Sequence, residues 1–452
     1  MTVNATAITT GTDALTGLAG YSSSQIELAA AVARANERGE VLSLAMIDVD
    51  RLKIFNDCFG KPHGDMVLRQ LADALAHAAD GWMAFRTGGD SFAVLIPGRG
   101  EADAKQTLAT RLDRACRAEP SVSFTSGIAT HMPGDGDDSS VLWERASASL
   151  SESKRSGRGQ IVTYSDVAKF VTVVTPSKVK ALRSLLAEPR LEIAFQPIWD
   201  LGNECLLGME ALARPWSGYG FEGPAEMFVI AEKIGRAHEL DAMCVAATLS
   251  RAPELPPGAE LFLNVNPQSL VHDTVTPEFL LGGVEKSGLT PGQIVLEVTE
   301  QSDARLDIVV DRANCFVDHG FQLALDDVGA GNAGLAMLCE MPVNYIKLDH
   351  SVISQLLTSI QARAVLISIA LFAFRVDAHL IAEGIETPEI LEFVRNAHHL
   401  DIMRDPPITG AQGYLLGRPS VDISLTPLTI QDALPAPPTP PIADTDTYAS
   451  AA

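Results

Sequence analysis

Seven short apolar runs recur through the second half of the chain, and stretches with helical periodicity separate them. The runs occupy residues 193–198, 206–212, 261–265, 294–298, 323–325, 345–348 and 380–382. A strand followed by a helix, repeated many times, is typical of a barrel of strands with helices outside. The pattern therefore predicts an α/β protein with a (β/α)8 TIM-like barrel at residues 178–421.

Six of these runs have an oxygen-bearing or cationic side chain at or near the C-terminal end. The side chains are Glu210, Asn264, Glu297, Asp326, Asp327, Lys347 and Glu383. The C-terminal ends of barrel strands converge on one face, so we expect these groups to meet there. Carboxylates gathered in a partly dry site repel one another unless a cation neutralises them.

The chemistry of this set indicates a hard divalent cation. Oxygen ligands favour Mg2+ or Mn2+ over zinc, and the adjacent Asp326 and Asp327 can serve two metal ions. A single acid at a strand end can equally be a helix N-cap or a solvated loop charge. The recurrence of such groups on six runs favours a metal site over that alternative.

The bulk properties limit the partners of this chain. A length of 452 residues predicts at least two domains, and a hydrophobic content of 46% excludes wholesale disorder. The formal net charge of -23 argues against nucleic acid as a partner, because phosphate backbones attract basic surfaces. An acidic enzyme can still take an anionic substrate where metal ions reverse the field locally.

The cysteines and apolar stretches predict a cytoplasmic protein without membrane contact. The six cysteines are scattered and form no CxxC pair, so we expect buried free thiols in a reducing compartment. The N-terminus does not have the basic and apolar regions of a signal peptide. The longest apolar stretch, around residues 364–374, is too short to span a bilayer, and we expect a buried helix there.

In the first half of the chain, the order of strand-like, helical and turn segments predicts a mixed α/β domain at residues 13–165. A strand-like run at 41–47 precedes a helical pattern at 64–79, and apolar runs at 82–85 and 92–96 flank Gly88 and Gly89. Two such runs around a glycine turn predict a β-hairpin. Of the remainder, we expect residues 1–12 to be a disordered N-terminus, 166–177 a linker, and 422–452 a Pro-rich tail.

Two carboxylates of this first half stand where a metal ion could bind. Asp48 follows the run at 41–47, and Asp90 follows the glycine pair of the hairpin. A carboxylate at a strand end and another on a glycine turn could hold Mg2+ against a triphosphate. The same residues are also compatible with an ordinary hairpin turn.

The second half resembles the EAL-domain phosphodiesterases of cyclic di-GMP. The main motif is Glu210-Ala211-Leu212-Ala213-Arg214. The other matches are Gln196-Pro197-Ile198, Asn264, Glu297-Val298-Thr299-Glu300, Asp326-Asp327-Val328-Gly329-Ala330-Gly331, Ile346-Lys347-Leu348-Asp349, Glu383-Gly384-Ile385-Glu386 and Gln412-Gly413-Tyr414. Val328 stands in place of the family's usual Phe, and Asn332-Ala333-Gly334 in place of Tyr-Ser-Ser; an insertion that contains residues 401–408 separates Glu383 from Gln412.

This resemblance implies a role for each matched residue. The metal ligands would be Glu210, Asn264, Glu297, Asp326, Asp327 and Glu383. Lys347 would orient or help to deprotonate the attacking water, and Glu300 would order the loop after Asp327. Arg214 would grip a substrate phosphate with its planar fork, and Gln196 and Gln412 would contact the nucleotide. The implied product is linear pGpG.

The first half resembles the GGDEF diguanylate cyclases. The matches are Asp13-Ala14-Leu15-Thr16-Gly17-Leu18, Asn56-Asp57, Gly64-Asp65 and Gly88-Gly89-Asp90-Ser91-Phe92. The resemblance implies metal ligation by Asp48, the Val49 carbonyl and Asp90, and guanine recognition by Asn56 and Asp65. The glycines allow close approach of a phosphate, and three basic residues would meet the phosphates: Lys53, Lys154 and Arg158.

One departure bears on cyclase activity. Ser91 replaces the carboxylate that the family has at the fourth position of its signature. We therefore expect a metal-dependent phosphodiesterase whose GGDEF-like domain binds GTP as a regulatory module. A bifunctional enzyme that also makes cyclic di-GMP is the first alternative, and a non-catalytic receptor for the dinucleotide is the second. Both families commonly act as dimers, which implies a homodimer.

Overall fold

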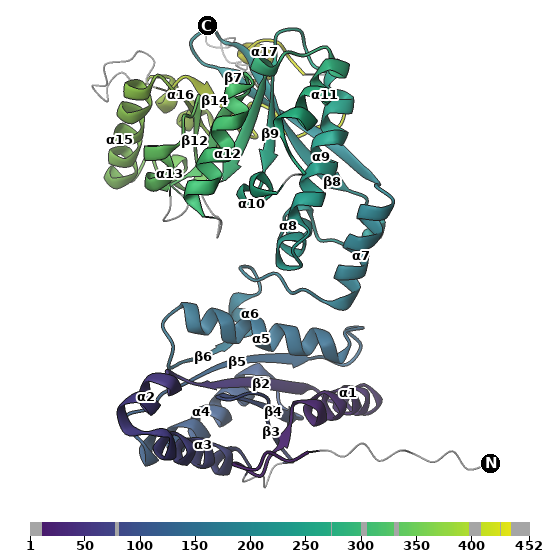
Figure 1. Ribbon diagram of the computed structural model, residues 1–452, viewed down its shortest axis with the longest axis vertical. Coiled ribbons are helices and arrows are strands. Elements are labelled where there is room, and N and C mark those ends of the chain that lie inside the picture. Colours follow the sequence, from purple (N-terminus) through teal and green to yellow (C-terminus); the bar gives the residue numbers. More distant parts are fainter. Residues whose placement is uncertain are drawn as a thin grey trace, which may run out of the picture. The chain divides into compact units, whose positions relative to one another are not determined.

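The computed structural model describes residues 11–76, 81–272, 274–299, 305–329, 334–396, 408–424 and 426–434. The chain divides into two compact units, Met1–Lys180 and Ala181–Ala452 (Figure 1). Both are built from helices and strands together, as the sequence predicted.

The first unit is a six-stranded sheet with helices on both faces. The strand order is β1-β3-β4-β2-β5-β6, and β3 pairs antiparallel with β4 as the predicted hairpin. The strands are β1 (Ala19–Gly20), β2 (Leu42–Val49), β3 (Met83–Arg86), β4 (Ser91–Pro97), β5 (Phe124–His131) and β6 (Ile161–Thr163). The helices are α1 (Tyr21–Arg38), α2 (Leu52–Phe59), α3 (Lys61–Ala76), α4 (Glu101–Ala118), α5 (Ser139–Arg155) and α6 (Tyr164–Val167).

Strand β2 shows why this sheet could be predicted. Ile47 and Val49 pack in one core with residues of α2, α3 and α4. Leu44 and Met46 point to the opposite face and pack with α1 and α5. Because successive side chains alternate between two buried faces, the strand reads as a continuous apolar run.

The second unit is a closed barrel, which confirms the predicted TIM-like fold. Its strand order is β10-β11-β12-β13-β14-β7-β8-β9. The strands are β7 (Leu191–Asp200), β8 (Cys205–Pro215), β9 (Glu260–Val265), β10 (Ile294–Thr299), β11 (Gln322–Val328), β12 (Tyr345–Leu348), β13 (His379–Ala382) and β14 (Gly410–Ala411). One strand departs from the all-parallel arrangement of a regular (β/α)8 barrel, because β7 runs antiparallel to both β8 and β14.

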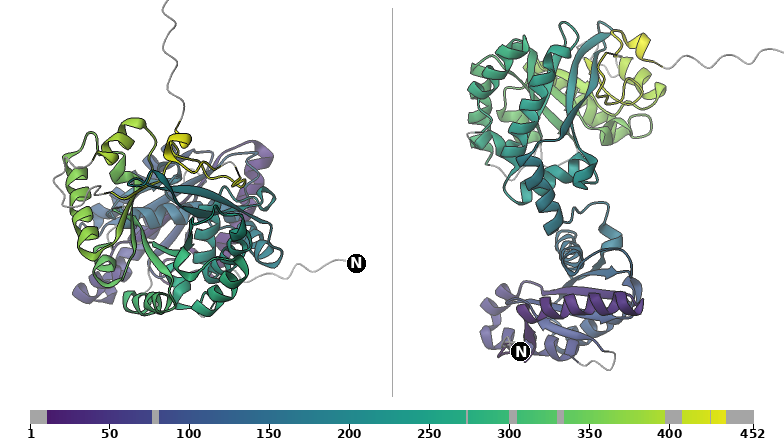
Figure 2. Two further views of the ribbon diagram at one scale, coloured as in Figure 1. Left: turned by 90° about the horizontal axis from the view of Figure 1, so that it is seen from above. Right: turned by 90° about the vertical axis from the view of Figure 1, so that its right-hand side faces the viewer.

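Helices surround these strands (Figure 2). They are α7 (Pro176–Ala187), α8 (Pro224–Lys233), α9 (Ala237–Arg251), α10 (Pro267–Val271), α11 (Pro277–Ser287), α12 (Leu306–Asp318), α13 (Gly334–Glu340), α14 (His350–Ile353), α15 (Ile360–Val376), α16 (Pro388–Arg395) and α17 (Ile430–Ala433). Short 3-10 turns cover Ser217–Tyr219, Ala252–Glu254 and Pro291–Gln293. In the described part of the chain, no helix is long and apolar enough to cross a membrane.

Several expectations need correction. Helix α15 forms where a buried helix was predicted, but Leu371 and Phe374 on it are 43% and 36% exposed. The thiols are free, but the prediction that they are buried was wrong for four, which are exposed: Cys58, Cys205, Cys315 and Cys339.

The predicted C-terminal tail and linker also differ from the structure. Within the expected tail, Thr429 bridges to Cys205 of β8, and Ile430 is fully buried. At the expected linker, α6 still belongs to the first unit, where Asp166 pairs with Lys105 at 3.5 Å. Folded structure therefore extends past both sequence boundaries, through an ion pair at the linker and a buried isoleucine in the tail.

Candidate active site

A layer of apolar side chains inside the barrel forms the floor of the site. The layer comprises Ile198, Phe262, Val295, Ala324, Tyr345 and Ile381. On a strand, residues two apart lie on the same face. Each of the five members from Phe262 to Ile381 is followed two residues later by a polar side chain: in order, Asn264, Glu297, Asp326, Lys347 and Glu383. The pleat thus directs these five side chains to the barrel interior, one level above the floor.

Lys347 lies fully buried at the centre of this level. Its Nζ is 2.6 Å from Glu297 Oε1, 2.9 Å from Glu383 Oε1, 3.2 Å from Asp326 Oδ1 and 3.5 Å from Glu210 Oε2. Four carboxylates from four strands therefore share one ammonium group. Their charges exceed that of Lys347, so the cluster is not neutral when all four are ionised.

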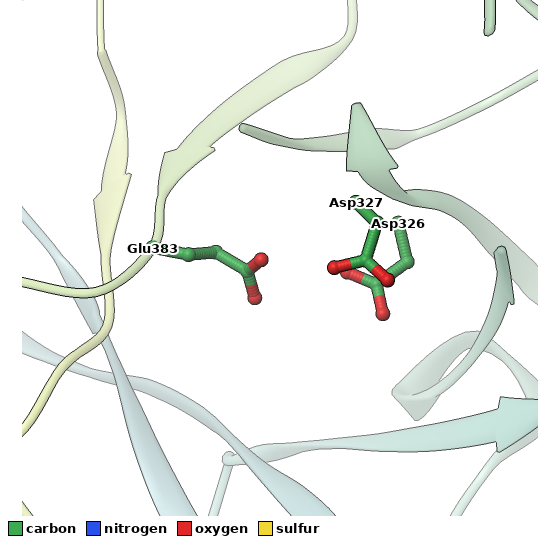
Figure 3. A group of neighbouring side chains, drawn as sticks. All are labelled: Asp326, Asp327 and Glu383. Carbon is green, nitrogen blue, oxygen red and sulfur yellow. The ribbon is translucent and has the colours of Figure 1, made fainter. Parts of the chain in front are cut away.

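A β-bulge brings two adjacent aspartates to the same site. Strand β11 shifts register against β12 between Leu325 and Val328, and Asp327 has a φ of 57°. A left-handed residue in a bulge turns a side chain that would otherwise point away. The carboxylates of Asp326 and Asp327 face that of Glu383, and oxygens of the three lie within 4.8 Å of one another (Figure 3).

The excess negative charge of the cluster raises the pKa values of most of these carboxylates. Burial and the neighbouring carboxylates raise the pKa of Glu383 to about 8 and that of Asp327 to about 6. Burial also raises the pKa of Glu297 well above its ordinary value, and that of Asp326. For Lys347, burial alone would lower the pKa, but the surrounding carboxylates raise it well above its ordinary value.

Glu210 is the exception among these acids. Burial opposes its ionisation, but Lys347 and two side-chain amides outweigh that effect and lower the pKa of Glu210. Asn264 Nδ2 donates to Glu210 Oε1 at 2.8 Å, and Gln412 Nε2 donates to Oε2 at 2.6 Å. Gln196 lies opposite Glu210 in the β7–β8 ladder, and its Nε2 donates to Gly417 O at 3.1 Å. The structure therefore brings Glu210 together with three of the predicted amides.

The donor set fits divalent cations. Apart from their ion pairs with Lys347, both carboxylate oxygens of Glu297 and Oδ1 of Asp326 are buried without a hydrogen-bond partner among the described residues. Several buried carboxylates that share a single ammonium group are costly unless further cations coordinate them. Asp326, Asp327 and Glu383 could together hold a metal ion. Glu300 and the insertion up to residue 407 lie outside the described residues.

Two cavities adjoin Glu210. The first, of about 420 Å³, is lined by Arg214, Asn264, Thr299 and the buried Asp241. The second, of about 340 Å³, is lined by Gln196, Gln412, Glu383, Glu386, His350 and Tyr414. The Arg214 NH1 group donates to Ala213 O at 2.9 Å. Both cavities thus reach the acidic cluster from the predicted substrate-binding residues.

Asp241 is a site residue that sequence reasoning missed. It lies on α9, it is 2% exposed, and its Oδ2 accepts a hydrogen bond from Asn266 N at 2.9 Å. Burial raises the pKa of Asp241 to about 6. Its signal in the sequence is weak, because a single acid in a helix is ordinarily a solvated residue.

In the first unit, the predicted metal ligands lie near one another. Val49 N donates to Asp90 O at 3.1 Å, which places the end of β2 beside the glycine turn. Asp48 is buried and forms an ion pair with Lys154. Ser91 Oγ donates to Asp90 Oδ1 at 3.4 Å. Lys154, which was predicted to contact a phosphate, therefore pairs with Asp48, which was predicted to bind a metal ion.

The predicted nucleotide-binding residues of the first unit are only partly assembled. Asn56 lies directly against Gly64, where a Cβ would collide with its amide. Asp65 follows Gly64 on α3, while Lys53 on α2 is exposed. Arg158 lies 3.5 Å from Asp50, whose carboxylate also accepts from Ser123, Thr125 and Gly159 N. Arg158 is thus held in a structural network.

Comparison with known proteins agrees with both resemblances. The EAL domain model matches residues 179–419, and the model of the diguanylate cyclase GGDEF domain matches residues 10–160. The chain therefore belongs to the EAL domain family, with a GGDEF domain in tandem before the barrel.

Two curated relatives match most of this chain. The chain is 27% identical over 422 residues to the cyclic di-GMP phosphodiesterase NbdA of Pseudomonas aeruginosa, covering 90% of this chain and 52% of NbdA. It is 26% identical over 396 residues to the bifunctional diguanylate cyclase/cyclic di-GMP phosphodiesterase MucR of the same organism, covering 83% of this chain and 55% of MucR. The chain thus spans about half the length of these curated relatives.

A solved structure shares the overall fold. The S helix–GGDEF–EAL fragment of Vibrio cholerae LapD, bound to c-di-GMP, superposes with a TM-score of 0.53 at 14% identity. The match covers 89% of this chain and 95% of that one. At this identity the likeness concerns the fold alone.

Proposed function

We propose that the barrel hydrolyses cyclic di-GMP to linear pGpG with two divalent cations, Mg2+ or Mn2+. The observation that carries this proposal is the fully buried Lys347 ringed by four carboxylates, with Asp327 beside them. Such a concentration of buried oxygen ligands is costly without cations, and perturbed carboxylates of this kind cluster at functional sites.

Each protein group has a part in this proposal. Glu210, Asn264, Glu297, Asp326, Asp327 and Glu383 hold the cations, which when bound supply an activated water and neutralise the phosphoryl oxygens. Lys347, which lies within 3.5 Å of four of these carboxylates, orients the attacking water or helps to deprotonate it. The role of Glu300 in ordering the loop after Asp327 stays a prediction.

The substrate extends into both cavities beside Glu210. Arg214 grips a phosphate from the first cavity, where Asp241 offers an acceptor for a base. Gln196 and Gln412 contact the nucleotide in the second cavity, with their orientations fixed by Gly417 O and Glu210. A dinucleotide with two bases matches two cavities that meet at one acidic cluster.

The GGDEF domain serves in this proposal as a GTP-binding regulatory module. The retained Asp48, Asp90, Asn56 and Asp65 support nucleotide binding, and Ser91 argues against efficient cyclisation. The alternative, a bifunctional enzyme, has support in the relative MucR, whose name includes both activities. The non-catalytic receptor is disfavoured because every expected metal ligand is present in the sequence.

A homodimer is part of the proposal. The outer face of α15 exposes Ile360 and Leu371, which are 74% and 43% accessible to solvent and lie eleven residues apart, on the same side of the helix. Apolar side chains that line one exposed helix face commonly pack against a partner. Light scattering coupled to size exclusion tests this, and a monomer at micromolar concentration would contradict it. The cytoplasmic location stays a prediction.

One product analysis separates the three functions. The full chain is incubated with Mg2+ and either cyclic di-GMP or GTP, and nucleotides are separated by chromatography. The proposal predicts pGpG from cyclic di-GMP and no cyclic di-GMP from GTP, with GTP changing the hydrolysis rate. Formation of cyclic di-GMP would establish the bifunctional enzyme. Tight binding without pGpG would establish the receptor.

A further inference from the structure

One imidazole stands in the wall of the second cavity. His350 follows Asp349 at the start of α14 and lines this cavity together with Glu383, Glu386 and Tyr414. Four acidic residues line this cavity, Glu210, Asp349, Glu383 and Glu386, and when ionised they can only accept hydrogen bonds. The ring of His350 makes no hydrogen bond or ion pair with any residue that the structure describes, so its N–H is available to a ligand.

His350 is exposed to solvent, and one side of its ring packs against the backbone next to the acidic cluster. It packs on Gly384, the residue after Glu383, and a Cβ on Gly384 would lie 2.7 Å from His350 Cβ and 2.8 Å from Cγ. Gly384 has a φ of +67°, which favours glycine. Asp349 accepts a hydrogen bond from Ser351 N at 2.8 Å and so caps the turn that carries His350. The imidazole of His350 therefore lies on the cavity wall, beside the residue that follows Glu383.

Guanine and adenine present different hydrogen-bonding groups to such an imidazole. Along one edge guanine presents two acceptors, N7 and O6, whereas adenine presents the N7 acceptor and the N6 amino donor. A carboxylate cannot donate to guanine O6, but it can accept from adenine N6. Left to its acidic residues, this cavity would accommodate adenine along that edge at least as well as guanine.

We propose that His350 donates its ring N–H to the N7/O6 edge of a guanine in this cavity and thereby selects guanine over adenine in a cyclic dinucleotide. The inference rests on the proposed hydrolysis of such a substrate. Glu386 and Asp349, on the same wall, provide acceptors for the N1–H and N2 amino groups of guanine. Donor and acceptors together match guanine and mismatch adenine.

The test compares kcat/KM for cyclic di-GMP and cyclic di-AMP with Mg2+ in the full chain. His350→Phe keeps a ring on Gly384 but removes the donor, and His350→Gln keeps a donor. The ratio of the two kcat/KM values is expected to fall about tenfold in His350→Phe, mainly through KM for cyclic di-GMP, and to stay within about threefold in His350→Gln. Tyr414→Phe removes a second side-chain donor of this cavity and is the matched control; the amides of Gln196 and Gln412 already donate to Gly417 O and Glu210.

The outcomes separate this inference from the proposed function. An unchanged ratio in His350→Phe, with thermal unfolding like that of the wild type, would overturn the role of His350 while hydrolysis stands. A loss of discrimination in Tyr414→Phe alone would assign the selection to the tyrosine instead. If the wild type hydrolysed neither dinucleotide, the proposed function would fall, and this inference with it.

Discussion

Asp241→Asn gives the most quantitative test of the electrostatics of the site. The carboxyl is 2% exposed, and burial raises its pKa from 3.8 to about 6. Below about pH 4 the group is protonated in both folded and unfolded chains, so it then costs no stability. As pH rises to about 6, the unfolded chain releases the proton before the folded one, and stability falls. The loss is complete above the folded pKa.

The size of the effect follows from this pKa. The rise from 3.8 to about 6 corresponds to about 3 kcal/mol, at about 1.4 kcal/mol for each pH unit. Asparagine can accept the hydrogen bond from Asn266 N and does not titrate. The variant should therefore be more stable than the wild type by about 3 kcal/mol at pH 8, and by about half as much at pH 5.

Urea unfolding of both proteins at pH 5 and pH 8, in EDTA, measures this difference. The midpoint difference between variant and wild type should widen with pH while the slope of the transition stays the same. A variant that is less stable than the wild type at pH 8, or a difference independent of pH, would refute the reasoning. The same substitution should raise KM for cyclic di-GMP, because Asp241 lines the cavity with Arg214.

Three further predictions follow from the same geometry. Mg2+ at one hundred times its Kd should stabilise the barrel by about 2.7 kcal/mol and raise its melting temperature by roughly 5–10 °C, and Asp327→Asn should lose most of that rise in calorimetry. Arg214→Lys should raise KM for cyclic di-GMP about tenfold with a smaller change in kcat, because one ammonium does not reproduce the planar fork; equal KM values would contradict this. Gly384→Ala should lower the free energy of unfolding by about 1–3 kcal/mol in chemical unfolding, since the added Cβ would meet His350 and the φ of residue 384 is +67°. An unchanged free energy of unfolding would count against the contact between Gly384 and the ring of His350.

The sequence predicted the barrel well because its strands are buried. Seven strands appear as apolar runs, and their pleat places Asn264, Glu297 and Lys347 one level above the apolar floor. The eighth strand, β14, covers only Gly410–Ala411 and is too short to leave a pattern. The reversed direction of β7 was also missed, since apolar composition does not encode strand polarity.

Other parts of the site depend on contacts that sequence reasoning could not see. The bulge that turns Asp327 toward Asp326 comes from a backbone conformation, not from a residue pattern. Asp241 reaches the first cavity from α9 and is recognised only once the helix is packed. In the first unit, the pairing of Lys154 with Asp48 and of Arg158 with Asp50 follows from tertiary contacts.

Anomalous diffraction from crystals grown with Mn2+ tests the central claim most directly. Six oxygen-bearing side chains around Lys347 should hold two ions about 3.5–4 Å apart, with Asp326 and Asp327 among their ligands. Two such peaks in the barrel mouth, absent from Asp327→Asn crystals for at least one ion, are the expected result. An empty mouth at saturating Mn2+, or ions bound only elsewhere on the surface, would contradict the account.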